Sequence, residues 1–261
     1  MAIVTICAAL AVPAILPAEQ VGVRYMEGVL HGFLALRTLD GTLVAGGDLI
    51  QVARGAQVTA EVVFHFKDGS LHNETTIFTQ RDRFRLVSNH LVQKGPTFPR
   101  QLDMTIRAES GQVTVRYKDE NEKEKVEDDH LDLPPDLSNG MMIVLLKNVA
   151  KNLPPTVSYV AATPKPRLVK LALSTAGVES FSIAGGSRRA IHYAIKPEIG
   201  GLAGLFAPIV GKQPPDNHVW ILEGPAPAFV KSEGPLYLGG PSWRIELTGP
   251  TWADARPATK Q

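Results

Sequence analysis

Hydrophobic and polar side chains alternate along much of the chain between residues 21 and 130. The clearest segment is Val58–Phe66, where one face carries only apolar side chains: Val58, Ala60, Val62, Phe64 and Phe66. A period of two is typical of a β-strand with one buried side. Similar segments cover residues 71–80, 84–92, 102–106 and 113–117. Within 84–92, the pattern predicts one shared face for Phe84, Leu86 and Val92.

Short turn sequences separate these strands. Asp68-Gly69 and Ser110-Gly111 are typical of tight hairpins, in which glycine adopts a positive φ. Parallel strands need a connection of a dozen or more residues, so strands joined this closely run antiparallel. Shorter strands resume after residue 156, and the later ones are separated by Gly-Pro pairs. Segment 200–206 fits either a short helix or an apolar loop.

One segment is predicted to be a helix. Met141–Lys151 contains no glycine or proline, and Pro154-Pro155 ends it. Asp136 or Ser138 is the expected N-terminal cap. The first residues of the helix are all apolar, so protein must cover it on most sides. We therefore expect the helix to lie on the concave face of a curved sheet.

Together these elements predict a mainly β fold, with a large antiparallel, strongly curved sheet and one helix packed on its concave face. A flat sheet of about a dozen strands is uncommon, because such sheets curl or close. The sheet is therefore expected to form a half-barrel or a barrel. We expect a single β-rich domain over residues 19–252 and a disordered tail at 253–261. The alternative is a boundary between two domains at Pro154-Pro155.

The first 18 residues carry no charge, and an apolar run is followed by Leu16-Pro17-Ala18. This pattern indicates a signal peptide, although no Lys or Arg precedes the apolar run. The alternative is a buried N-terminal strand or helix. The signal predicts export to the periplasm or the extracellular space of a bacterium. The only cysteine, Cys7, lies in this segment, so cleavage leaves a chain without thiols.

Composition and motifs narrow the range of functions. The net charge of +1 gives no support to a nucleic-acid partner. None of the seven histidines belongs to an HExxH or HxH motif, and no glycine-rich segment fits a nucleotide-binding loop. The serines at Gly185–Arg188 and Gly240–Trp243 lack the context of a nucleophile elbow. We therefore predict no cofactor and no metal, and favour a protein that is not an enzyme.

Three local clusters each have a functional and a structural interpretation. Residues 118–132 hold eight acids against three lysines, which fits a site for a cation or basic partner, or a solvated hairpin. The alternating Arg81, Arg83 and Arg85 suit anionic headgroups or acidic partners, or a solvated strand face. Late aromatic residues fit a pocket mouth or ordinary packing; they are Trp220, Phe229, Tyr237, Trp243 and Trp252.

Segments Phe64–Ser70, Gln93–Pro99 and His218–Trp220 resemble parts of an uncharacterised family of exported bacterial β-rich proteins. That resemblance covers much of the mature chain and implies no activity. The strand meander with a helix folded onto it is also similar in architecture to the half-barrel of periplasmic lipoprotein carriers. This second resemblance implies a lipid or lipoprotein ligand, and it is one of fold alone.

The leading hypothesis is a non-enzymatic periplasmic protein that binds an apolar or amphipathic ligand, such as a lipid acyl chain, on the concave face. The expected lining residues are Val62, Phe64, Phe66, Met141 and Leu145, which fit a dry core as well. One alternative is a structural or assembly module of the envelope that acts through protein partners. Another is a hydrolase whose catalytic residues come together from distant segments.

Overall fold

The computed structural model describes residues 20–119, 121–149, 153–183, 185–198 and 215–249. The expected signal peptide, Cys7, segment 200–206, Trp252 and the expected tail lie outside these ranges. No helix in the described ranges has the length and apolar character needed to cross a bilayer.

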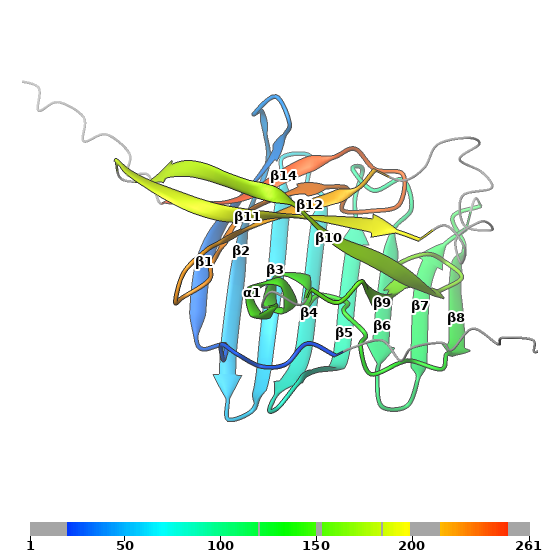
Figure 1. Cartoon of the computed structure of the whole chain (residues 1–261). Coiled ribbons are helices and arrows are strands. Elements are labelled where there is room, and N and C mark those ends of the chain that lie inside the picture. The colour runs from blue at the N-terminus through cyan, green and yellow to red at the C-terminus, as the bar shows by residue number, and fades with distance from the viewer. Residues whose placement is uncertain (1–19, 120, 150–152, 184, 199–214, 250–261) are drawn as a thin grey trace, which may run out of the picture.

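All strands of the described residues belong to one antiparallel sheet in the order β8-β7-β6-β5-β4-β3-β2-β1-β14-β13-β12-β11-β10-β9 (Figure 1). The strands are β1 (Leu30–Thr38), β2 (Leu43–Arg54), β3 (Gln57–Phe66), β4 (Leu71–Gln80), β5 (Phe84–Lys94), β6 (Leu102–Arg107), β7 (Gln112–Lys118), β8 (Glu124–His130), β9 (Thr156–Ala161), β10 (Arg167–Ile183), β11 (Gly186–Pro197), β12 (Asn217–Leu222), β13 (Phe229–Gly234) and β14 (Trp243–Thr248). β1 pairs with β14, which joins the two halves of the chain. The sheet is not closed, because β8 and β9 form its two edges.

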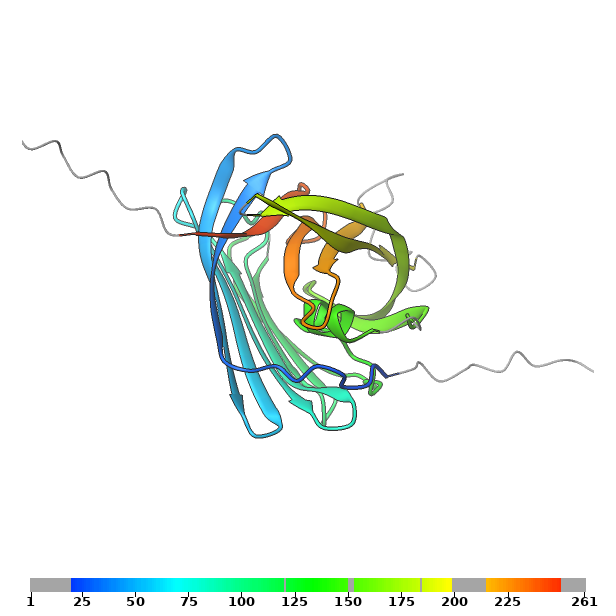
Figure 2. The ribbon, with the colours of Figure 1, turned by 60° about the vertical axis from the view of Figure 1, so that its left-hand side comes forward.

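The sheet curls around the single described helix, α1 (Met142–Asn148), as Figure 2 shows. Met141, Val144 and Leu145 pack against the concave side of β3–β7, whereas Leu146 and Val149 pack against β9–β13. Each buried side chain of this size contributes about 1.5–3 kcal/mol. The predicted mainly β fold, with a curved antiparallel sheet and a helix on its concave face, is confirmed.

A third group of buried side chains lies where β1–β3 meet β14. It contains Leu34, Leu36, Phe64, Phe66 and Trp243, together with Ala45 and Phe98. The Phe66 ring contacts the rings of Phe98 and Trp243, with centroids 5.4 and 5.7 Å apart. These residues come from both ends of the chain, so this cluster holds the β1–β14 junction together.

The face predicted for Val92 is wrong, because β5 contains a β-bulge. Ile77 pairs with Ser88 but Phe78 pairs with Leu86, so Val87 is an extra residue. Beyond the bulge the buried positions are Asn89, Leu91 and Gln93, and Val92 points to the other face. The bulge therefore places two polar side chains on the concave side.

The predicted bounds and cap of the helix also differ from the structure. α1 ends at Asn148, since Val149 already has extended backbone angles. Asp136 and Ser138 do not cap it. They bind Ser158 of β9 instead: the Asp136 carboxylate accepts from the Ser158 amide at 3.0 Å, and the Ser138 hydroxyl donates to the Ser158 carbonyl at 2.7 Å. These bonds fix α1 to β9, which a cap would not do.

The segment before β1 crosses the end of the concave face, and we call residues 20–29 the strap (Figure 1, dark blue). The Asn148 Oδ1 atom accepts from the amides of Arg24 and Tyr25 at 2.9 and 2.7 Å. Gln80 of β4 bonds the backbone of Glu27 through both of its amide atoms. The strap is therefore tied to both α1 and the sheet.

Candidate functional site

One row of side chains on the concave face keeps accessible surface while the rows beside it do not. Leu49, Val62 and Glu74 lie directly opposite one another on β2, β3 and β4. All three are half-buried. The next rows are buried, and they contain Phe64 and His72 on one side and Ala60 and Thr76 on the other. On β3 and β4, the accessible surface of the concave face is thus confined to this row.

Glu74 lies at the polar end of this row. Its Oε1 atom accepts from the Asn89 Nδ2 atom at 2.9 Å, and the same Nδ2 atom also donates to the Thr76 hydroxyl at 3.0 Å. Burial raises the pKa of Glu74, because low-polarity surroundings disfavour the charged carboxylate. Glu74 is therefore a carboxyl group in low-polarity surroundings that keeps some accessible surface.

Tyr159 of β9 faces Glu74 across the interior. Burial raises the pKa of Tyr159, and the nearby Glu74 charge raises it further. β9 lies at one end of the sheet and does not pair with β4, so only the curl of the sheet brings these residues together. Tyr159 is also half-buried. The two residues lie near enough for the Glu74 charge to affect Tyr159.

Asn89 adds an unsatisfied acceptor to this site. The residue is 1% exposed, and its Oδ1 atom has no hydrogen-bond partner among the described residues. A buried polar atom without a partner costs about 1–3 kcal/mol. Gly140, with φ +66°, closes over this region: an added Cβ would lie 1.9 Å from the Thr76 hydroxyl oxygen. The wall beside Glu74 is therefore tightly packed and contains a buried acceptor without a partner.

Accessible apolar surface continues from this row toward β14. Leu49 pairs with Gly32 of β1, and an added Cβ on Gly32 would meet the Leu247 Cδ2 atom at 3.0 Å. Leu247 is 46% exposed although it pairs with the buried, inward-facing Leu34. An apolar strip therefore runs from Val62 through Leu49 to Leu247, with Glu74 at its other end.

The structure does not gather the five predicted lining residues at one point. Val62 belongs to the accessible row. Phe64 and Phe66 are buried at the β1–β14 junction, and Met141 and Leu145 are buried between α1 and β3–β7. A cavity of about 10 Å³ lies beside Met141 and Leu145, which is room for about one water molecule. Their part in ligand binding stays a prediction.

A second polar cluster lies on the outer face of β10–β13, and sequence reasoning missed it. The His192 Nε2 and His218 Nδ1 atoms are 2.9 Å apart, and the Glu179 carboxylate lies 3.0 Å from His192 Nδ1. The ring of Trp220 stacks on His192 at 4.1 Å, with Lys231 above its other side at 4.0 Å. Burial lowers the pKa of His192 despite the nearby Glu179. Only the strand register brings these residues together.

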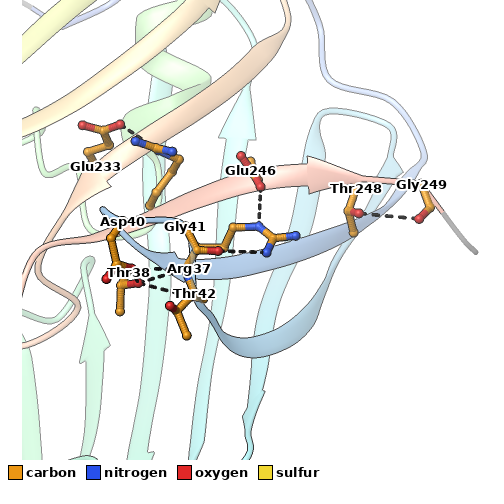
Figure 3. A network of polar contacts seen from close by, with 10 residues as sticks. Arg37, Thr38, Asp40, Gly41, Thr42, Glu233, Glu246, Thr248 and Gly249 are labelled. Carbon is orange, nitrogen blue, oxygen red and sulfur yellow. Dashed lines mark hydrogen bonds and ion pairs between the residues drawn. The ribbon is translucent and has the colours of Figure 1, made fainter.

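Ion pairs continue this outer face toward β1 (Figure 3). Arg37 of β1 lies 2.6 Å from Glu246 of β14, and Arg244 lies 2.9 Å from Glu233 of β13. Arg37 and Glu246 are each about one-third exposed, so their pair contributes about 0–1 kcal/mol. We interpret this network as structural support for the β1–β14 junction.

The remaining clusters lie apart from the concave face. Four of the eight acids of segment 118–132 lie on β8, where most side chains are exposed, as expected for a solvated hairpin. In the described part of the chain, no three His, Cys, Asp or Glu side chains are grouped so as to hold a metal ion. Trp220 and Trp243 are separated, because Trp243 packs with Phe66 and Tyr237.

The chain matches no protein-family model and no curated protein sequence. It is similar to a crystal structure of a β-barrel-like protein of the domain of unknown function DUF1849 from Brucella abortus. The two share 12% sequence identity, and the alignment covers 85% of this chain and 96% of the other, with a TM-score of 0.43. The fold described above rests on the strand pairing of this chain alone.

Proposed function

We propose that this protein is a non-enzymatic, exported protein of the bacterial periplasm that binds an amphipathic molecule, such as a lipid with an acyl chain, on the concave face of its sheet. The observation that carries the proposal is the accessible row Leu49–Val62–Glu74, which is flanked by buried rows on β3 and β4. Ligand sites are typically concave and mostly apolar, with a few polar groups that fix orientation. This row has that composition.

The apolar part of the ligand lies along Val62, Leu49 and Leu247. The polar head lies at Glu74 and Tyr159, where a hydroxyl or amine can donate to the accessible Glu74 carboxyl group. Such a hydrogen bond contributes about 0.5–1.5 kcal/mol, so a head group with a donor binds better than a plain hydrocarbon. We therefore expect the protein to bind an acyl chain that carries a hydroxyl or amine head group more tightly than it binds an alkane.

Titration with a fluorescent fatty-acyl probe, together with native mass spectrometry of protein purified from its own envelope, tests the proposal. Val62→Phe adds volume on the concave face and should reduce probe affinity at least about tenfold, since overpacking costs about 1–3 kcal/mol. Val63→Phe is the matched control: Val63 is the next residue of β3 and points to the outer face. It should bind as the parent protein does.

Glu74→Gln tests the polar end of the site independently of the apolar strip. It should weaken a probe with a free hydroxyl or amine head more than a probe with a methyl ester. The proposal fails if no lipid co-purifies and no acyl probe binds. It also fails if the Val62 and Val63 variants lose affinity equally.

We propose a second candidate, an envelope assembly module that binds a protein partner. Phe33, Ile50 and Val52 support it, because these apolar side chains are about 37–45% exposed on the outer face of β1 and β2. A photo-crosslinking residue at Ile50 should capture one defined partner in cells, whereas the same residue at the exposed His65 should not. Equal capture at both positions would remove this candidate.

A further inference from the structure

A cleft of about 430 Å³ opens at the tip of the β4–β5 hairpin, and Thr79, Arg81, Asp82, Arg83 and Arg85 line it. The prediction that the three arginines alternate on one strand is wrong: only Arg85 belongs to β5, and Arg81 and Arg83 precede it. Arg83 instead forms a bridge with Gly22 of the strap. The three arginines nevertheless line the same cleft.

The strap holds the backbone of this cleft in place. The Val23 amide donates to the Asp82 carbonyl at 3.0 Å, and the Phe84 amide donates to the Val21 carbonyl at 3.1 Å. The Arg83 Nη1 atom donates to the Gln20 carbonyl at 2.9 Å. The backbone of the cleft and the Arg83 side chain are therefore held in place without a ligand, which lowers the ordering cost of binding.

The cleft carries unpaired positive charge. The lining contains three arginines and one acid, Asp82, and no salt bridge joins the three arginines to any acid within the described ranges. In the same part of the chain, Arg81 and Arg85 make no side-chain hydrogen bond, so their donors remain available. A net charge of about +2 matches a phosphoryl group, which carries about −1.5 to −2 at neutral pH.

We propose that this cleft binds the phosphoryl group of a ligand. A carboxylate is satisfied by a single guanidinium fork, whereas a phosphoryl group has three oxygens that accept from several forks at once. The volume falls within the range of about 300–1,000 Å³ typical of ligand pockets, so the cleft accommodates more than a bare ion. The site is independent of the concave face, and its ligand is either a small phosphate compound or a phospholipid head group.

Isothermal titration at low salt with inorganic phosphate and with glycerol 3-phosphate tests the site, and flotation with vesicles tests the lipid source. Vesicles of phosphatidylglycerol are compared with vesicles of phosphatidylcholine. Arg81→Gln/Arg85→Gln should weaken phosphate binding at least about tenfold, because it removes two of the three cations that bind the phosphoryl oxygens. Arg83 is left intact, since it also holds Gln20. Arg100→Gln, at an exposed arginine outside the cleft, is the control and should bind normally.

Asp82→Asn gives the sharper test. It removes the only negative charge of the cleft but keeps the backbone carbonyl that binds Val23, so phosphate affinity should rise several-fold. Binding of both small phosphates, or of phosphatidylglycerol vesicles alone, supports the site and identifies the source. The proposal is overturned if none of these ligands binds, if Arg100→Gln weakens binding as much as the double variant, or if Asp82→Asn leaves affinity unchanged.

Discussion

Lys147 of α1 and Glu27 of the strap form an ion pair almost completely inside the protein. The Lys147 Nζ atom lies 2.5 Å from the Glu27 Oε1 atom, and the side chains are 16% and 6% exposed. Gln51 of β2 donates to the other carboxylate oxygen at 2.9 Å. The helix, the strap and the sheet therefore meet at one charged contact.

Lys147→Met should lower the free energy of unfolding by about 3–5 kcal/mol, because it leaves the buried Glu27 charge without its partner. Urea unfolding followed by circular dichroism measures this loss. Lys147→Met/Glu27→Gln removes both charges and should recover a large part of it. Lys118→Met, which breaks the exposed pair with Glu122, should change stability by about 1 kcal/mol or less. Equal losses for Lys147→Met and Lys118→Met would contradict the buried character of the first pair.

Asn148 fixes the strap through two backbone amides, those of Arg24 and Tyr25. Asn148→Ala removes the shared acceptor and should destabilise the protein by about 2 kcal/mol. Hydrogen exchange detected by mass spectrometry should show faster exchange in residues 20–29, with little change in β3 and β4. Asn121→Ala, at an exposed turn residue, is the control. Unchanged exchange in the strap of Asn148→Ala would show that other contacts suffice to hold it.

His72 makes stability depend on pH. Burial lowers the pKa of His72 from its ordinary value of 6.5 to about 4. The ring accepts at Nδ1 from the Gln93 Nε2 atom at 3.1 Å, which fits the neutral form. Because the folded-state pKa lies below the unfolded value, the stabilisation that the protein gains from keeping His72 neutral is complete above pH 6.5. It is lost as the pH falls toward 4.

This loss amounts to about 3 kcal/mol over that range. Urea unfolding between pH 7.5 and 4 measures it. His72→Phe keeps a ring against Phe64 and Phe98 and should remove this part of the pH dependence. His65→Phe changes the other histidine of the β3–β4 hairpin, which is exposed. This variant should keep the pH dependence of the parent protein. A parent protein equally stable at both ends of the range would disprove the assignment.

Strand positions were predictable wherever apolar residues alternate without interruption. The segment Val58–Phe66 corresponds to β3 with one residue added, and Gly69 has the positive φ of +84° expected at the hairpin. The same rule predicted the buried faces of Leu102, Met104 and Ile106. In each case one residue contacts the core and the next does not, so the local sequence is sufficient to predict the strand and its buried face.

The candidate site was less predictable, because its members depend on partners far along the chain. On β4 the inward positions include His72, Glu74 and Thr76, which look like the outer face of a strand. They are tolerated inside because Asn89 and Gln93 bond to them, and the bulge at Val87 is what turns those two residues inward. No local sequence pattern predicts that bulge. The opposition of Glu74 and Tyr159 likewise follows only from the curl of the sheet.

Two adjacent glycines of β2 differ sharply in what surrounds them. A Cβ added to Gly47 would lie 2.1 Å from the Val63 carbonyl oxygen and 2.6 Å from the Phe64 Cδ1 atom. A Cβ added to Gly46 would meet nothing within 4 Å. Gly47→Ala should therefore force β2 away from β3 and lower the free energy of unfolding by at least about 1–3 kcal/mol, because backbone atoms cannot yield as a flexible side chain does.

Gly46→Ala should change stability by no more than about 0.5 kcal/mol, since it fills open space at the surface. Urea unfolding under identical conditions compares the stability of the two variants. They differ only in which of two adjacent glycines is replaced by alanine. Because β2 also carries Leu49, Gly47→Ala should weaken binding of the fatty-acyl probe while Gly46→Ala does not. Similar stability for the two variants would mean that β2 and β3 are not packed as closely as the register of Gly47 and Phe64 requires.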